Sequence, residues 1–295
     1  MSGLLSMFQS SIRMMLPLLF ASLGVMLSSR IGFINMSMEG GMLSSAFIAV
    51  AVDLKTGSPW LGLLAAIVCG IIYFMLLGVL VVNFRGNHVV CSLGLNMVAS
   101  GGTIVLMSAV FGATGYSPQV EKLPQMNLPV LGQQSVSIFI AIAVTAAILW
   151  FLRKTNFGLR VNAIGENTSA ADSLGIPVTK YKFIIMILTG ILAGLGGSEL
   201  AIGQMGFFAK GMTSSKGFLA YSAVVFAGFR PTVTILTTFI LAFFEALQMR
   251  AQTFTSMPSE FLLTLPYVVT IVALIITNNK RKPAMLGRIY ERDKE

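Results

Sequence analysis

The sequence predicts an all-α fold, a polytopic bundle of about nine or ten transmembrane helices. Three observations support this prediction. The 295 residues have a mean hydropathy of +0.83, and 55% are hydrophobic while only 11% are charged. Apolar runs of about 18 to 25 residues, long enough to cross ~30 Å of hydrocarbon, recur between short polar gaps. These runs lack the apolar–polar alternation of outer-membrane barrel strands, so a barrel is excluded.

Nine spans are predicted along the chain. They cover residues 12–29, 41–52, 60–83, 89–111, 135–152, 183–203, 217–229, 232–249 and 260–277. The second and seventh are short for a straight crossing, so each is predicted to be a broken or partly re-entrant helix that borrows length from its flanks. The whole chain, 1–295, is interpreted as one integral membrane domain.

Basic residues are distributed unevenly between the two sides of this topology. Placing the 153–182 loop and the 278–295 tail on one side collects 14 of the 20 basic residues there. The other side keeps Arg13, Lys55, Lys122, Lys210, Lys216 and Arg250. Because basic loops stay in the cytoplasm, the loop and the tail are predicted to be cytoplasmic. Nine spans then place the amino terminus outside, and the proline-containing segment 112–134 becomes an external loop.

Two short segments resemble each other across this topology. IGFINMSM at 31–38 and MGFFAKGM at 205–212 share three identities in eight positions and lie on opposite predicted faces. Either an inverted repeat or chance accounts for the similarity.

Composition also excludes several classes of function. The formal net charge of +9 comes from the predicted cytoplasmic loops, which face anionic lipid, and not from a nucleic-acid surface. Cys69 and Cys91 lie in apolar runs, so neither a disulfide nor a metal site is assigned, and no cofactor is predicted. His88 is interpreted as a solvated residue at the membrane edge. The sequence contains no G-x-x-x-x-G-K-[ST] phosphate loop, so energy must come from a separate subunit or from an ion gradient.

The stretch GENTSAADSLGIPVTKYK, residues 165–182, interrupts this apolar chain with a polar loop. Ser169 and Asp172 have capping-box spacing, and Gly175 followed by Pro177 is a helix stop. The loop therefore contains a helix of under two turns, which is marginal alone.

A second surface must hold such a short helix. Ala170, Ala171 and Leu174 are predicted to form one small apolar face, which favours docking into the groove of a partner protein over binding to lipid.

Longer stretches of the chain carry a family resemblance. FGLRVNAIGENTSAADSLGIPVTKYK is followed by LTGILAGLGGSELAIGQMGFF and GMTSSKGFLAYSAVVFAGFRP, and preceded by INMSMEGGMLSSAF at 34–47 and FRGNHVVCSLGLNMVA at 84–99. In this order they resemble the permease subunits of ATP-binding cassette (ABC) importers of the nucleoside and simple-sugar type, relatives of the branched-chain amino acid and ribose permeases. The resemblance covers about residues 30–277.

The resemblance implies a coupling helix that seats in a cleft of the ATPase subunit. The positions that match are Gly165, Glu166, Asn167, Ala170, Ala171, Asp172, Ser173, Gly175 and Ile176. It further implies an ABC ATPase, a second permease in a heterodimer, an extracellular substrate-binding lipoprotein and a small hydrophilic solute. The expected location is a bacterial cytoplasmic membrane. Thr168 stands where the family commonly has proline, and Ser198-Glu199 where it has a small residue and an aromatic, which puts the substrate class in doubt.

Polar residues inside the spans are the candidates for the substrate route. They are Asn35, Glu39, Asn96, Glu199, Gln204, Glu245 and Gln248. A buried carboxylate costs ~2.5 kcal/mol or more unless it faces a cavity or a partner. Glu245 either pairs with Arg250 or lines the route, and Glu39 either caps the second span or lines it. Glu199 has no basic partner in its own span, which favours a water-filled route.

Three function classes compete. The first is the permease of an ATP-driven importer, with purine nucleosides ahead of simple sugars and riboflavin-like solutes. The alternative is a proton-coupled secondary transporter that uses Glu199 and Glu245. An intramembrane enzyme is disfavoured, because the chain offers one histidine and no paired carboxylate motif.

Overall fold

The computed structural model describes residues 2–112, 115–128, 131–254 and 282–288, with the single positions 264, 268 and 271. The helices are α1 (Ser2–Arg30), α2 (Met38–Thr56), α3 (Pro59–Gly78), α4 (His88–Phe111), α5 (Ser137–Lys154), α6 (Asn156–Glu166), α7 (Thr168–Ser173), α8 (Val178–Ser198), α9 (Lys216–Phe226) and α10 (Pro231–Phe254). Two π-helical segments, η1 (Val79–Asn83) and η2 (Glu199–Met205), continue α3 and α8. A short hairpin pairs β1 (Gln125–Leu128) with β2 (Gly132–Ser135).

The predicted all-α transmembrane fold is confirmed. Six helices in the described part of the chain are long and apolar enough to cross a membrane: Leu5–Arg30, Pro59–Asn83, His88–Phe111, Ser137–Lys154, Val178–Met205 and Pro231–Gln252. The second and seventh predicted spans correspond to α2, which has 19 residues, and α9, which has 11. The predicted span 260–277 lies outside the described residues, apart from three isolated positions.

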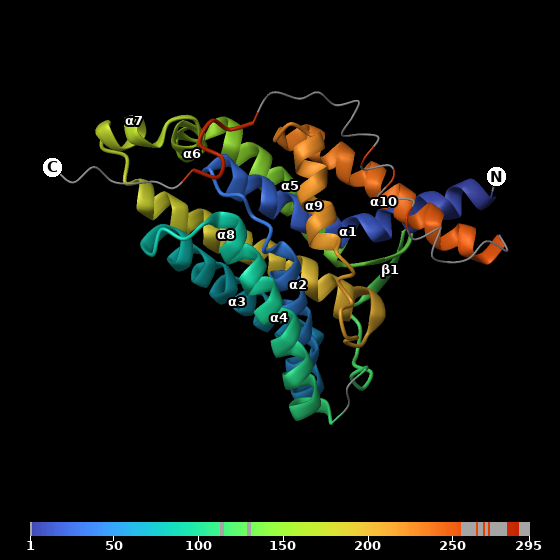
Figure 1. Cartoon of the computed structure of the whole chain (residues 1–295). Helices are drawn as coiled ribbons and strands as arrows, with labels where there is room; N and C mark the ends of the chain where they lie inside the picture. Colours follow the sequence, from blue (N-terminus) through green and yellow to red (C-terminus); the bar gives the residue numbers. More distant parts are fainter. Residues whose placement is uncertain are drawn as a thin grey trace.

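Helix α1 forms the centre of the bundle. Its side chains from Leu18 to Leu27 are almost completely buried, and it packs mainly against α8, α9 and α10. In Figure 1 this blue helix runs through the middle of the molecule. A hydrophobic helix that is buried on all sides is expected at the core of a membrane bundle.

Glycines allow α3 and α8 to pack with their backbones in close approach. A Cβ added at Gly190 would lie 2.6 Å from the carbonyl oxygen of Gly70, and one at Gly194 would lie 2.5 Å from Cα of Ile67. Only a residue without a side chain fits at such contacts, which are typical of helix pairs in membranes.

The segment 112–134, predicted to be an external loop, contains a short hairpin that the sequence analysis did not indicate. The segment contains β1 and most of β2, and the hairpin lies against α1. Arg13 donates a hydrogen bond of 3.0 Å to the carbonyl of Gln133, and Gln134 donates one of 3.1 Å to the carbonyl of Gln9. Strands of four residues are too short to produce a clear periodic pattern, and the absence of a helical period does not indicate them.

The two ends of α1 define the two sides of the bundle. Its first half contacts the hairpin of the predicted external segment, whereas Arg30 at its last turn contacts the predicted cytoplasmic loop. In Figure 1, α6, α7 and the red 282–288 segment lie together at the upper left, away from β1. The external position of the amino terminus stays a prediction.

His88 is not a solvated edge residue, so that interpretation is wrong. Its side chain is 4% exposed and lies against the Phe33 ring, with ring centroids 4.9 Å apart. Nδ1 accepts a hydrogen bond of 3.3 Å from the backbone N–H of Ile34. The imidazole therefore fixes the chain segment that joins α1 to α2.

Candidate functional site

The predicted coupling loop folds into α6 and α7, joined at Asn167. The Asn167 side chain accepts a hydrogen bond of 3.0 Å from the backbone N–H of Ala170 and so caps α7. The capping box predicted at Ser169 is therefore wrong. Asn167 has extended backbone angles between the two helices, the usual conformation of an N-cap, whereas Ser169 already lies within the helix.

Burial divides the predicted coupling residues into two groups. Glu166, Asn167, Ala170, Ser173 and Gly175 are exposed, Asp172 and Ile176 are half-buried, and Gly165 and Ala171 are buried. The predicted apolar face of Ala170, Ala171 and Leu174 is thus not a single face, because Ala171 packs inward at 2% exposure. Leu174 is 82% exposed and leaves a large apolar side chain on the surface.

Gly165 holds the coupling loop against the bundle. A Cβ at this position would collide with the carbonyl oxygen of Arg30. The Arg30 guanidinium donates to Asn162 Oδ1 and to the carbonyl of Phe229, each at 2.9 Å. The Gly165 carbonyl in turn accepts a hydrogen bond of 3.0 Å from the backbone N–H of Met285. The loop is therefore tied to the end of α1, to the turn before α10 and to the 282–288 segment.

A second site lies where α2 and α9 begin. Helix α2 begins at Met38, whose side chain is fully buried against Gly24, six residues before the end of α1. Gly217, in the first turn of α9, packs against the backbone of Glu39, where a Cβ would clash. The similar segments 31–38 and 205–212 lead into these two helices. Helix α2 extends beyond the predicted span on both sides, to 19 residues, whereas α9 has only 11, and re-entrance of either helix stays a prediction.

Glu39 links α2 and α9. Its carboxylate accepts hydrogen bonds from the Thr213 hydroxyl at 2.5 Å and from the backbone N–H groups of Ser215 and Gly217 at 2.9 and 2.7 Å. The suggestion that Glu39 caps its own helix is wrong, because the carboxylate satisfies the amino-terminal N–H groups of α9 instead. A carboxylate is favourable there, since the helix dipole is positive at this end.

Asn35 and Asn96 support the chain segment before α2. Asn35 is fully buried, donates to the Ser28 hydroxyl and accepts from the backbone N–H of Ser37. Asn96, on α4, donates to the carbonyl of Met36 and accepts from the backbone N–H of Gly40, both at 2.8 Å. Both amides thus satisfy non-helical backbone within the bundle, and their place on the substrate route stays a prediction.

Glu245 pairs with Lys216. The Lys216 ammonium, at the first residue of α9, forms an ion pair with Glu245 on α10, and both side chains are largely buried. The expected pair with Arg250 is wrong, because Arg250 donates to the Ser6 hydroxyl at 2.5 Å. Lys216, counted with the external basic residues, lies inside the bundle. Gln248, one turn beyond Glu245 on α10, is buried at 7% exposure.

A third site is a polar well on the predicted external side, with a volume of about 140 Å³. It is lined by Arg13, Lys122, Gln125, Gln133, Ser135, Glu199, Gly203 and Gln204. Glu199 is 1% exposed, whereas Arg13, Lys122 and Gln133 are exposed at the mouth. Three separate parts of the chain, namely α1, the 122–135 hairpin region and η2, therefore meet around one carboxylate.

Comparison with known proteins identifies the chain. Residues 7–275 match the family described as the branched-chain amino acid transport system permease component. The chain belongs to this family. It is an ABC transporter permease subunit and a multi-pass membrane protein, and not itself the ATPase.

Named relatives extend over most of the permease. It is 33% identical to the nucleoside ABC transporter permease protein NupC of Lactococcus lactis, over 88% of both chains. It is 32% identical to the guanosine ABC transporter permease protein NupQ of Bacillus subtilis, over 88% of this chain and 87% of that one. A glucose ABC transporter permease protein, TsgB13 of Haloferax volcanii, is 28% identical over 69% of this chain and 59% of its own.

A solved structure has the same fold. A chain of the structure entitled PsaBC from Streptococcus pneumoniae in complex with Fab matches with a TM-score of 0.53. The match covers 91% of the permease and 92% of that chain, at 15% sequence identity.

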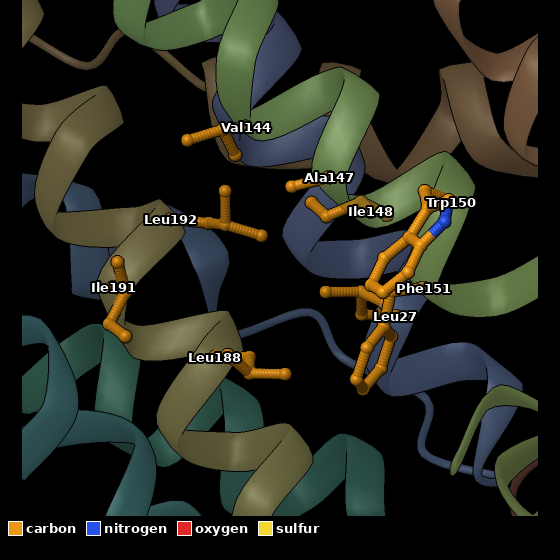
Figure 2. Close-up of a pocket in the computed structure, with 9 residues that line it drawn as sticks. All are labelled: Leu27, Val144, Ala147, Ile148, Trp150, Phe151, Leu188, Ile191 and Leu192. Carbon is orange, nitrogen blue, oxygen red and sulfur yellow. The ribbon is translucent and has the colours of Figure 1, made fainter. Parts of the chain in front are cut away.

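The permease also has an apolar groove of about 300 Å³ between α5 and α8. Figure 2 shows its nine lining side chains, among them Val144, Trp150 and Phe151 on α5 and Leu188 and Leu192 on α8. Apart from the indole N–H of Trp150, the lining offers no hydrogen-bonding group. This groove therefore does not suit a hydrophilic solute.

Sequence reasoning missed several residues of these sites. Lys216 was assigned to an external loop, and Arg13 and Lys122 were only counted as external charges. Tyr73, on α3, accepts a hydrogen bond of 3.0 Å from the Ser37 hydroxyl and donates to Asn96. A carboxylate in an apolar span is a signal for a basic partner on another helix, but the sequence does not indicate which one.

Proposed function

We propose that this permease is one half of the membrane pore of an ATP-driven importer for nucleosides or related ribosyl or simple-sugar solutes. Purine nucleosides are the first candidates, because the relatives named for nucleosides and guanosine match over nearly the whole chain. Simple sugars and riboflavin-like solutes follow. The proposed location is a bacterial cytoplasmic membrane.

The observation that carries this proposal is the exposed helix α7. It is capped by Asn167 and presents Leu174 at 82% exposure on the side predicted to be cytoplasmic. An exposed leucine beside small residues suits a cleft on a partner protein. In the proposed complex, residues 165–176 seat in the ABC ATPase, a second permease completes the pore, and an extracellular substrate-binding lipoprotein delivers the solute.

Burial decides which residues face the ATPase in this proposal. Gly165 and Ala171 pack inward and position the loop, while Ala170 and Leu174 make the contact. Leu174→Asp should therefore disrupt docking without disturbing the fold, since its side chain contacts little of the permease itself.

The test is co-purification of the tagged permease from its native membrane. Leu174→Asp should reduce the recovered ATPase at least tenfold. The matched control is Leu54→Asp, an exposed leucine near the other end of the bundle, which should recover as much ATPase as the wild type. Equal recovery with Leu174→Asp and wild type would remove α7 as the contact. Uptake of radiolabelled guanosine, lost when the ATPase gene is deleted, tests the substrate class.

A proton-coupled secondary transporter is the second candidate, favoured by the buried Glu199 carboxylate. Glu245 supports it less, because its charge is paired with Lys216. Uptake that persists without the ATPase and collapses when the proton gradient is removed would establish this alternative and overturn the importer.

A further inference from the structure

The polar well has a buried floor and an exposed mouth. Glu199 and Ser135 form the floor, with exposed fractions of 1% and 4%, and the mouth carries Arg13 and Lys122. Glu199 starts η2, a π-helical segment inside an otherwise α-helical span, and such segments frequently occur at functional positions. The well is therefore a built depression and not a gap between loosely packed helices.

The hydrogen bonding of the Glu199 carboxylate is incomplete. The hydroxyls of Ser135 and Ser137 and the amide of Gln204 lie close to it, but neither carboxylate oxygen has a hydrogen bond of good geometry among the residues that the structure describes. A buried carboxylate is costly unless its hydrogen bonds are complete, so a bound species is expected to complete them. Gly203 leaves room for this carboxylate, because a Cβ there would collide with Glu199 Oε2.

The remaining groups of the well are a mixture of donors and acceptors. Gln204 donates its amide to the carbonyl of Arg13 and Gln125 donates to the carbonyl of Gly203, both at 2.8 Å. Both amide oxygens are therefore left as acceptors, beside the Glu199 carboxylate. Lys122 supplies N–H donors, and the amide of Gln133 supplies both kinds of group.

The charges of the well select the class of ligand. A cation would be repelled by Arg13 and Lys122, and an anion would be repelled by Glu199 at the floor. A neutral polyol avoids both costs. Each hydroxyl donates one hydrogen bond and accepts others, which matches a carboxylate and amide oxygens set opposite N–H groups.

Size restricts the ligand further. At ~30 Å³ for each water, about 140 Å³ corresponds to roughly five water molecules, which is below the ~300 Å³ at which pockets for whole drug-sized ligands begin. We propose that the well is a subsite for the vicinal hydroxyls of a single sugar ring, held by Glu199 at the floor and Lys122 at the mouth. This inference rests on the proposed function and assigns a subsite on its external side.

The test measures occupancy of the well without transport. A reporter cysteine, Gln133→Cys, is placed at the mouth in a Cys69→Ser, Cys91→Ser background, and the whole transporter complex is reconstituted in nanodiscs. The rate of maleimide labelling is followed with D-ribose, 2-deoxyribose or sodium phosphate. D-ribose should slow labelling at least fivefold at saturation, and 2-deoxyribose should need about tenfold higher concentration, because one hydroxyl is lost.

Three variants locate the site. Glu199→Gln should raise the ribose concentration for half-protection about tenfold or more, because a hydrogen bond to a charged acceptor is lost. Lys122→Gln should also weaken protection. Because Lys122 is exposed at the mouth, this change should not disturb the packing around the buried Glu199. Glu121→Gln is the matched control, an exposed carboxylate next to Lys122 that does not line the well, and it should behave like the parent.

The other outcomes overturn the subsite. Protection by phosphate but not by ribose would make the well an anion site, and protection by neither would leave a cavity filled only with water. Equal weakening by Glu121→Gln would show that ribose acts elsewhere. Ribose protection combined with uptake that is independent of the ATPase would retain the subsite and reject the proposed importer. Nucleoside uptake that depends on the ATPase, without any protection of the reporter cysteine by ribose, would retain the importer and reject the subsite.

Discussion

The Glu39 carboxylate, on α2, accepts a hydrogen bond of 2.7 Å from the backbone N–H of Gly217 in the first turn of α9. Two helices are thereby joined inside the bundle through residues that are 178 positions apart in sequence. In hydrocarbon, the unpaired N–H groups of a helix that begins at this depth would each be costly. One carboxylate satisfies two of them and complements the dipole of α9 as well.

We expect Glu39→Gln to lower the free energy of unfolding by about 1–3 kcal/mol, because the amide loses the charge and offers one acceptor in place of two. Thermal melting of the purified permease in detergent checks this. Glu121→Gln, at an exposed carboxylate, should leave the melting temperature unchanged. Equal melting of the Glu39 variant and wild type would contradict the capping role.

Breaking the Lys216–Glu245 pair should be strongly destabilising. Lys216→Met leaves a largely buried carboxylate without its cation, at a cost of about 3–5 kcal/mol. Glu245→Gln leaves the buried ammonium of Lys216 without its anion, at a similar cost. In a double-mutant cycle, the two costs should fall short of additivity by about 1–3 kcal/mol. Additive costs would mean that the two side chains do not interact in the membrane.

A pair of Gly→Ala changes separates close packing from helix propensity. Gly190→Ala should destabilise by about 1–3 kcal/mol, because its Cβ meets the carbonyl of Gly70 at 2.6 Å. Gly101→Ala, in α4 with no atom of the described chain within 4 Å, should stabilise by about 0.5–1 kcal/mol. If both variants shifted the melting temperature in the same direction, close packing at Gly190 would not explain its effect.

The cap of α7 can be tested one side chain at a time. Asn167→Ala should reduce the local stability of α7 by about 1 kcal/mol, because the N–H of Ala170 loses its acceptor. Ser169→Ala should have little effect. Amide hydrogen exchange over residues 168–174 measures both effects. Faster exchange in the Ser169 variant alone would contradict the Asn167 cap and support the capping box predicted from the sequence.

The sequence predicted this fold well because hydropathy is averaged over long segments. Eight of the nine predicted spans correspond to helices in the described part of the chain; of the two short ones, the second became the 19-residue α2 and the seventh the 11-residue α9. The hairpin at 125–135 was missed, because strands of four residues leave no periodic signal.

Side-chain partners were predicted less well than helices. Glu39 and Glu245 were recognised as residues that need a partner, but their partners Thr213 and Lys216 come from distant elements. Which helices meet depends on contacts between glycines and neighbouring backbones, and these cannot be derived from local sequence. Arg250 was one of two alternatives considered for Glu245 because the two are close in sequence, but α10 turns them toward different neighbours.

Helix α1 contacts both of the polar sites proposed above, one near its middle and one at its last turn. Arg13 lines the well, while Arg30 binds Asn162 and the turn at Phe229, beside the loop proposed to meet the ATPase. The two arginines are separated by roughly 25 Å of helix at ~1.5 Å per residue. Only Pro17 interrupts the hydrogen-bond ladder between them. A single helical segment nearly as long as the hydrocarbon is thick thus connects the predicted external and cytoplasmic faces, and Pro17 is the position at which it can bend.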